Sequence, residues 1–133
     1  MVDADTVEQL LKADNRPYER IDPGTWRSSF HGEAKSFRFF VRLTENWIFF
    51  TIVPFVRAAP SGPAERRLHR YLLRLNREIN MAKFAIDDEG DVVLTVELPT
   101  ENLDASEFRD ALDALVFYAD KHYVEVARAA QEE

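Results

Sequence analysis

The side chains able to do chemistry in this sequence are three histidines, a short acidic run and a stripe of arginines. The histidines stand far apart, at His31, His69 and His122, and the chain contains no cysteine. A thiolate zinc site and a cysteine nucleophile are therefore excluded, and no other nucleophile, base or carboxylate pair stands at a recognisable catalytic spacing. The glycine-containing segments match no phosphate-binding loop. We expect no enzymatic activity and assign no catalytic or metal-binding residue.

The acidic run consists of Asp87, Asp88, Glu89 and Asp91. Such a cluster suggests calcium binding, but it lacks the twelve-residue ligand pattern and the closing glutamate of a calcium loop. We interpret the run as a solvated turn. His122 falls on the apolar side of the last expected helix, where we predict a hydrogen-bonded core histidine rather than a metal ligand.

Five arginines form a stripe along one face of a helix expected over residues 64–81. They are Arg66, Arg67, Arg70, Arg74 and Arg77. This basic stripe fits either of two roles: it binds phosphate groups or an acidic peptide, or it is a solvated face that pairs with the acidic part of a second subunit. Leu73 lies in the same sector of the helix, which favours a protein contact over a phosphate contact.

The formal net charge is −7, and the negative charge is concentrated near the C-terminus. Residues 84–133 hold fourteen acids and three bases, whereas residues 64–83 hold two acids and six bases. An acidic surface repels a phosphate backbone, so nucleic acid is disfavoured as a partner. No apolar stretch approaches the length of a membrane helix, and Asp3 and Asp5 stand where a signal peptide carries lysines. We expect a cytoplasmic protein with no membrane partner.

The strongest strand pattern is a hairpin over residues 37–56. Apolar residues alternate with others over 37–43, a polar break at 44–46 follows, and the run over 47–56 is apolar on both faces. In this second strand we expect Trp47, Phe49, Val53 and Phe55 on one face, and Ile48, Phe50, Ile52 and Val56 on the other. A strand that is apolar on both faces belongs in the centre of a sheet.

Helices and further strands complete the pattern. A short helix is expected with Asp5 or Thr6 as its N-cap, a strand is expected over 26–30, and a second hairpin joins 83–86 to 91–98. Asp104 and Glu107 form a capping box for a long last helix. The order α-β-β-β-α-β-β-α predicts a single α+β domain over residues 1–133, with three helices and an antiparallel five-stranded sheet.

This architecture has more apolar surface than its helices can cover. Two helices cover about one face of a five-stranded sheet, and Phe117 and Val124 lie about half a turn from the core stripe of the last helix. Exposed apolar patches usually mark an interface, so we expect a homodimer that buries either the middle helix or the second face of the sheet, with a remaining apolar groove for a partner segment. We assign that surface to Phe40, Phe50 and Ile52, and subunit or partner contacts to Leu73, Phe117 and Val124. The alternative is a monomer whose twisted sheet and loops cover these residues.

Two segments carry a family resemblance, over residues 72–99 and 103–123. Their most specific part is the phrase Leu-Asn-x-x-Ile-x-x-x-x-Phe-Ala from Leu75 to Ala85, followed by a hairpin and Leu-Pro. The chain resembles the YbjN-like family of bacterial proteins, described as regulators of sensory transduction. That family is similar in fold to type III secretion chaperones, which are small acidic dimers with the same order of elements. The resemblance implies a non-enzymatic binding or chaperone-like role with no bound cofactor.

Three functional hypotheses follow from these observations. The first is a dimeric chaperone-like or regulatory module that holds a segment of a partner protein on its apolar surface or adds it to a sheet edge. The second is a regulator whose basic stripe contacts nucleic acid or an acidic partner. A small hydrolase or metal enzyme is the third and the least favoured.

Overall fold

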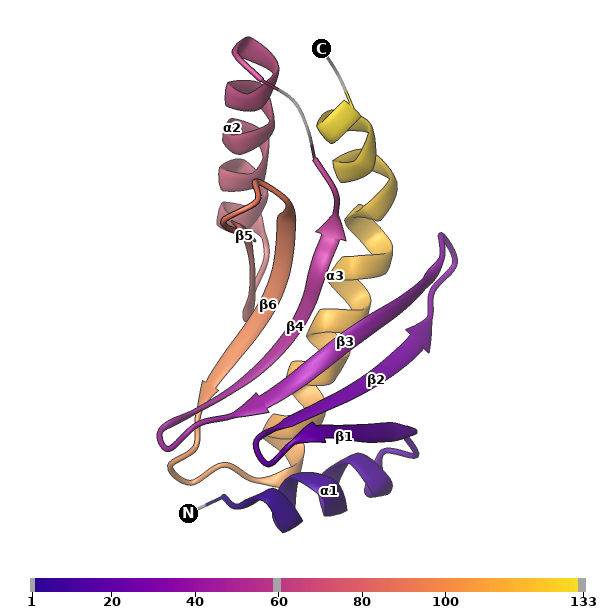
Figure 1. Ribbon diagram of the computed structural model, residues 1–133, viewed down its shortest axis with the longest axis vertical. Helices are drawn as coiled ribbons and strands as arrows, with labels where there is room; N and C mark the ends of the chain where they lie inside the picture. Colours follow the sequence, from indigo (N-terminus) through magenta and orange to yellow (C-terminus); the bar gives the residue numbers. More distant parts are fainter. Residues whose placement is uncertain (1, 59–60, 132–133) are drawn as a thin grey trace.

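A six-stranded antiparallel sheet is the framework of the protein, in the order β1-β2-β3-β4-β6-β5. The computed structural model describes residues 2–58 and 61–131 (Figure 1). Its elements are α1 (Ala4–Ala13), β1 (Tyr18–Asp22), β2 (Thr25–His31), β3 (Ser36–Leu43), β4 (Trp47–Val56), α2 (Pro63–Glu78), β5 (Ala82–Ile86), β6 (Val92–Pro99) and α3 (Ala105–Gln131). The expected α+β architecture, with three helices and an antiparallel sheet, is confirmed for these residues.

The number of strands differs from the prediction, because β1 adds a sixth strand before the expected five. Its residues, Tyr-Glu-Arg-Ile-Asp, are mostly charged and exposed, so they carry no alternating apolar pattern. The strand pairs only with β2, from Tyr18 opposite Ser28 to Asp22 opposite Thr25. An edge strand needs little apolar burial when backbone pairing holds it, and sequence periodicity therefore misses it.

Helix α3 packs against β4 and β6 on one face of the sheet. In the view of Figure 1 it passes behind β3 and β4. The ring of Phe50 on β4 meets Phe108 on α3 edge to face, with centroids 5.1 Å apart. Asp104 caps α3 as expected: its Oδ1 accepts a hydrogen bond from the Glu107 N–H at 2.8 Å, and that bond lowers the pKa of Asp104. We call the face of the sheet covered by α3 the inner face.

Helix α1 covers the β2 end of the inner face. Asp3 caps this helix, whereas the sequence analysis expected the cap at Asp5 or Thr6. The Asp3 Oδ1 accepts a hydrogen bond from the Thr6 N–H at 2.9 Å. Val7 and Leu11 are buried, and the Glu8 carboxylate accepts a hydrogen bond from the indole N–H of Trp26 at 3.0 Å. The helix thus joins the core through both apolar and polar contacts.

The alternation of side chains between the two faces of the sheet is interrupted near the end of β4. Its pairing with β6 shifts between Ile52 and Val56, around the Val53–Pro54 bond, because proline has no N–H to offer the ladder. The shift turns Phe55 to the inner face, where its ring lies 5.7 Å from Tyr123 and 5.6 Å from Phe84. The prediction that Phe55 shares a face with Trp47 and Phe49 is therefore wrong.

Candidate partner-binding surface

The outer face of the sheet, opposite α3, has no helix packed on it in residues 2–58 and 61–131. Its middle is built from residues that alternate with the core residues of β3 and β4, because neighbouring residues of a strand point to opposite faces. Phe40 and Arg42 lie on β3, and Phe49, Thr51 and Val53 lie on β4; all five are partly or fully exposed. A mixed apolar and polar surface is thus left open to solvent.

The strand register places these outer residues in cross-strand rows. One row runs from Thr25 through Arg42 to Phe49, and the next runs from Arg27 through Phe40 to Thr51. Phe40 and Phe49 are therefore diagonal neighbours, close enough for aromatic rings to share one ligand. The burial of the inner face determines which residues of neighbouring strands pair, and this pairing in turn determines which outer residues lie side by side.

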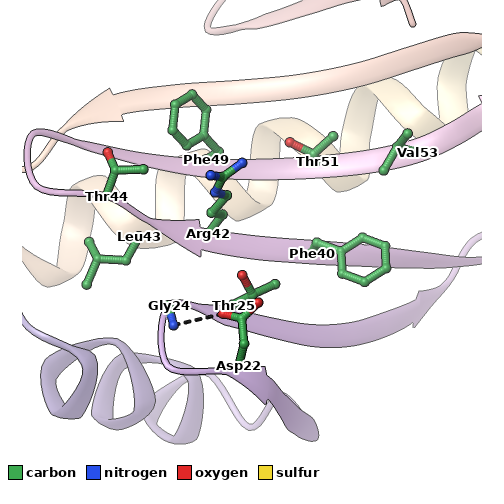
Figure 2. A pocket seen from close by; sticks show the side chains of 10 residues that line it. All are labelled: Asp22, Gly24, Thr25, Phe40, Arg42, Leu43, Thr44, Phe49, Thr51 and Val53. Carbon is green, nitrogen blue, oxygen red and sulfur yellow. Dashed lines mark hydrogen bonds between the residues drawn. The ribbon is translucent and has the colours of Figure 1, made fainter. Parts of the chain in front are cut away.

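A hollow of about 630 Å³ opens on this face (Figure 2). Its apolar lining comes from Phe40, Leu43, Phe49 and Val53, and the Arg42 side chain reaches toward Phe49 between them. The turn between β1 and β2 forms one wall, held by a 2.9 Å hydrogen bond from the Gly24 N–H to the Asp22 carboxylate. The hollow is open and shallow, as a surface for a chain segment is, rather than an enclosed site for a small molecule.

Of the three residues assigned to the apolar surface, only Phe40 lies in this hollow. Phe50 and Ile52 are 0% and 2% exposed on the inner face, so their assignment to the exposed surface is wrong. The physical reason is the cover by α3, which packs on the side of β4 that carries them. Phe49 and Val53, their neighbours on the other side, are the residues that the sequence analysis missed, although the alternation of β4 contained the signal.

Leu73, Phe117 and Val124 are exposed, as the prediction of contact residues requires, at 70%, 57% and 51%. They lie on α2 and α3 and do not join the hollow of the sheet. Phe117 borders a shallow hollow together with Asp113 and Asp120. Exposure agrees with a contact role, and the contact itself stays a prediction.

The basic stripe lies on the solvent side of α2. Arg66, Arg67 and Arg70 line a shallow hollow at the start of the helix, next to Pro63. Arg74 and Arg77 continue the stripe and are also exposed. The stripe is separate from the outer-face hollow, because none of its arginines lines that hollow.

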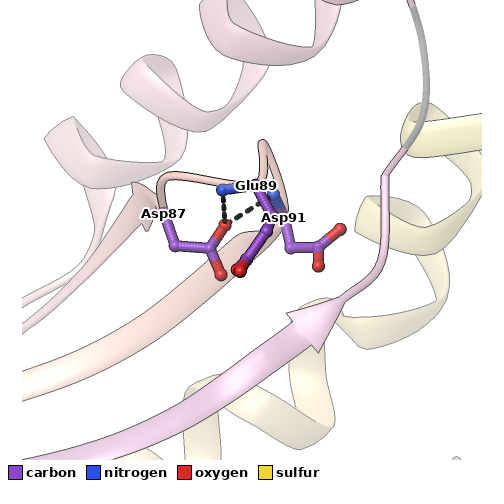
Figure 3. A group of neighbouring side chains, drawn as sticks. All are labelled: Asp87, Glu89 and Asp91. Atoms are coloured by element: carbon purple, nitrogen blue, oxygen red, sulfur yellow. Dashed lines mark hydrogen bonds between the residues drawn. The ribbon is translucent and has the colours of Figure 1, made fainter.

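The acidic run forms the turn between β5 and β6. Asp87, Glu89 and Asp91 can bring one carboxylate oxygen each within 4.8 Å of one another (Figure 3). Asp87 Oδ1, however, already accepts hydrogen bonds from the N–H groups of Glu89 and Asp91, both at 3.0 Å. Asp91 Oδ1 accepts from the Ala58 N–H at 2.9 Å. The carboxylates of Asp87 and Asp91 thus fasten the turn, and the Glu89 side chain is exposed beside them.

His122 belongs to α3, and its side chain lies against Phe84 of β5. It differs from its prediction in one respect. Its ring stacks on Tyr118 and meets Phe84 edge to face, both with centroids 6.1 Å apart. Its Nε2 is buried and has no hydrogen-bond partner among the described residues, so the expected hydrogen bond is missing at this atom. Burial lowers the pKa of His122, the Lys121 charge lowers it further, and Glu78 opposes the shift.

None of the helices in the described part of the chain is long and apolar enough to cross a membrane.

Comparison with solved structures defines the class of fold. A chain of the heterodimeric ExoU-SpcU complex from the type III secretion system of Pseudomonas aeruginosa is 18% identical, with a TM-score of 0.63, over 94% of this chain and 98% of that one. A chain of the HopA1-SchA chaperone-effector complex is 13% identical, with a TM-score of 0.57, over 88% of each chain. The fold is thus one that occurs in a complex of a type III secretion system and in a chaperone-effector complex.

The particular family follows from the sequence. The model of the YbjN family, whose description is "Putative bacterial sensory transduction regulator", matches residues 3–128. The chain therefore belongs to the YbjN family. The crystal structure of YbjN from E. coli is similar to it, at 15% identity and a TM-score of 0.61 over 91% of each chain. No curated protein matches the chain.

Proposed function

We propose that this protein is a dimeric, non-enzymatic binding module that holds a segment of a partner protein against the outer face of its sheet. The observation that carries the proposal is the open hollow lined by Phe40, Phe49 and Val53 on a face without helical cover. The fold likeness to a chaperone-effector complex supports a chaperone-like role. Membership of the YbjN family supports a regulatory one.

The energetic argument rests on two half-exposed aromatic rings. Phe40 and Phe49 are neither buried nor fully exposed, so each still loses apolar area to water. Burying a fully exposed Phe side chain contributes about 1.5–3 kcal/mol, and completing the burial of each of these partly buried rings contributes a part of that. A segment that covers both rings at once therefore gains enough to offset part of the entropy it loses on ordering.

The partner binds on the face rather than at the β5 edge. At Phe84 in the middle of β5, the N–H and the C=O both form hydrogen bonds to the side chain of Asn76 on α2, at 2.7 and 3.0 Å. An added strand would have to displace that side chain to reach the same two groups. Strand addition at this edge is therefore disfavoured.

The proposed homodimer uses the helices. Leu73 on α2 and Phe117 and Val124 on α3 are exposed apolar residues outside the sheet hollow. The basic stripe of α2 and the acidic surface of α3, which includes Asp110, Asp113 and Asp120, have opposite charges. A two-fold arrangement that places α2 of one subunit on α3 of the other would pair these charges twice.

Selection from a displayed library of short random peptides tests the proposed function. Wild-type protein should retain peptides, and the variant F40S/F49S should lose them because the apolar lining of the hollow is gone. The variant M81S, which removes an exposed apolar side chain after α2, is the matched control and should retain them. Cooperative thermal unfolding shows that each variant is folded. A wild-type protein that enriches no peptide, or equal retention by F40S/F49S, contradicts the proposal.

A further inference from the structure

The outward residues of β3 combine cations with an aromatic ring. Arg38, Phe40 and Arg42 follow one another at every second position, so all three point to the outer face. Both arginines are exposed. The two arginines stand four positions apart on an extended strand, which is about 13 Å. A partner lying along β3 therefore meets a positive charge, a ring and a second positive charge.

Two pairs of opposite charges also lie on this face. Arg27 on β2 pairs with Glu19 on β1, and Lys83 on β5 pairs with Glu97 on β6 at 2.6 Å. Arg38 and Arg42 take part in no ion pair within residues 2–58 and 61–131.

One acid shares a hollow with each of the two arginines, and both acids have other hydrogen-bond partners. Glu19, which lines a neighbouring hollow with Arg38, is bound to Arg27. Asp22, which lines the main hollow with Arg42, accepts a hydrogen bond from the Gly24 N–H. The two arginines thus remain available to an incoming group.

The positive charge of the outer face is unusual for this acidic chain. The formal net charge of the protein is −7, yet on the outer face two unpaired arginines outnumber the single carboxylate of the hollow, Asp22, beside the pairs Arg27–Glu19 and Lys83–Glu97. A second copy of the chain placed with its own outer face on this one would bring like charges together, which is destabilising. Charge complementarity therefore favours a different, acidic occupant.

We propose that the partner segment is an extended, acidic peptide with an apolar side chain between two carboxylates. The carboxylates pair with Arg38 and Arg42, and the apolar side chain enters the hollow against Phe40 and Phe49. In an extended peptide, carboxylates four residues apart match the spacing of the two arginines. Arginine suits this role because its planar guanidinium binds a carboxylate through two parallel hydrogen bonds. This inference rests on the proposed function and specifies the chemistry of the partner.

A nucleic acid also offers anions to arginine, but the observations favour a peptide. The outer-face hollow has four apolar lining residues for its one arginine, and a peptide can match such a mixture on every second side chain. A phosphate backbone would also meet repulsion from the acidic C-terminal part of the chain. Binding to nucleic acid is therefore an outcome that the test must distinguish.

The same displayed library tests the inference through the composition of the retained peptides. Wild-type protein should enrich Asp and Glu on both sides of an apolar position, and high salt should weaken retention. The variant R38E/R42E should retain the wild-type acidic peptides about tenfold less and select basic residues instead. The matched control K12E/R57E reverses two exposed cations that lie outside both the outer-face hollow and the basic stripe, and it should select the same acidic peptides as wild type.

The outcomes separate this inference from the proposed function. Retention of peptides without acidic enrichment, or the same selection by R38E/R42E and wild type, overturns the inference and leaves the proposed function standing. The absence of any retained peptide overturns both. Binding of a short DNA or RNA oligonucleotide that displaces the selected peptides, and that is lost in R38E/R42E, would replace the peptide with a nucleic acid as the occupant.

Discussion

The side chain of Asn76 on α2 forms two hydrogen bonds to the backbone of Phe84 on β5. Its Oδ1 accepts from the Phe84 N–H at 2.7 Å, and its Nδ2 donates to the Phe84 C=O at 3.0 Å. The amide thereby acts as a short substitute for a neighbouring strand. It fastens α2 to the sheet and occupies the outer edge of β5 at its centre.

Replacement of Asn76 by alanine should destabilise the protein by about 1–3 kcal/mol, because two partly buried backbone groups lose their partners. Urea denaturation measures the free energy of unfolding. Arg77→Ala, one residue further along the same helix and exposed, is the control and should change stability by less than about 0.5 kcal/mol. Equal stability of the two variants would show that the pair of hydrogen bonds contributes nothing.

The turn between β2 and β3 should depend on Asp120 of α3. Asp120 Oδ1 accepts hydrogen bonds from the Glu33 N–H at 2.7 Å and the Ala34 N–H at 3.3 Å. A Cβ atom on Gly32 would lie 2.5 Å from that same oxygen. Gly32→Ala should therefore push the carboxylate away and cost about 1–2 kcal/mol of stability.

A double-mutant cycle separates this clash from a general effect of the turn. In the Asp120→Ala background the added methyl group has no carboxylate to meet, so Gly32→Ala should cost clearly less than in the wild type. Thermal or urea unfolding of the four proteins provides the coupling energy. Additive losses would mean that Gly32 and Asp120 act independently.

The stability of the protein should fall as the pH falls below about 6.5, the ordinary pKa of histidine. The folded-state pKa of His122 is lowered, first by burial and then by Lys121, while Glu78 opposes the shift. The unfolded chain therefore binds a proton more readily than the folded one in the range just below 6.5. Stability from neutral His122 is complete above that pH and is lost as the pH falls toward the lowered value.

Urea unfolding at a series of pH values between about 5 and 8 measures this dependence. His122→Gln, which cannot take up a proton, should have a flatter profile than the wild type over this range. His69→Gln on α2 controls for the removal of a histidine as such. A profile of His122→Gln that is as steep as that of the wild type would assign the dependence to other groups.

The proposed dimer predicts a change of mass when a charge is placed on α3. Phe117 is 57% exposed, so Phe117→Asp should leave the fold intact while it weakens an apolar subunit contact. Sedimentation velocity should detect a dimer for wild type and a larger fraction of the 15.4 kDa protomer for the variant. Ile21→Asp on the edge strand β1, also an exposed apolar position, is the control. A wild-type protein that sediments as a protomer at micromolar concentration would exclude this dimer.

Local signals predicted much of the fold. The hairpin of β3 and β4 follows from alternation around a polar break, and the start of α3 follows from the capping pair Asp104 and Glu107. Both features are encoded within a few residues of sequence. Strand β1 was missed for the converse reason, since its order comes from pairing with β2 and little from burial.

The candidate site was predicted only in part, because it depends on which face of β4 the helix covers. The alternation separates Phe49 from Phe50 but does not say which of the two meets α3. The turn of Phe55 to the inner face depends on a shift of register that spacing alone does not show. The sequence does not show that Arg38 and Arg42 lack an ion pair, because this depends on which acids of the neighbouring strands pair with other cations.

The most direct test of the central claim is to map where a retained peptide binds. Amide chemical shifts of the isotopically labelled protein, recorded during titration with a library-selected peptide, locate the contact surface. We predict that the largest changes fall on the outer-face residues around Phe40, Arg42, Phe49 and Thr51. Changes concentrated on α2 and α3, with the outer face of the sheet unaffected, would contradict the account.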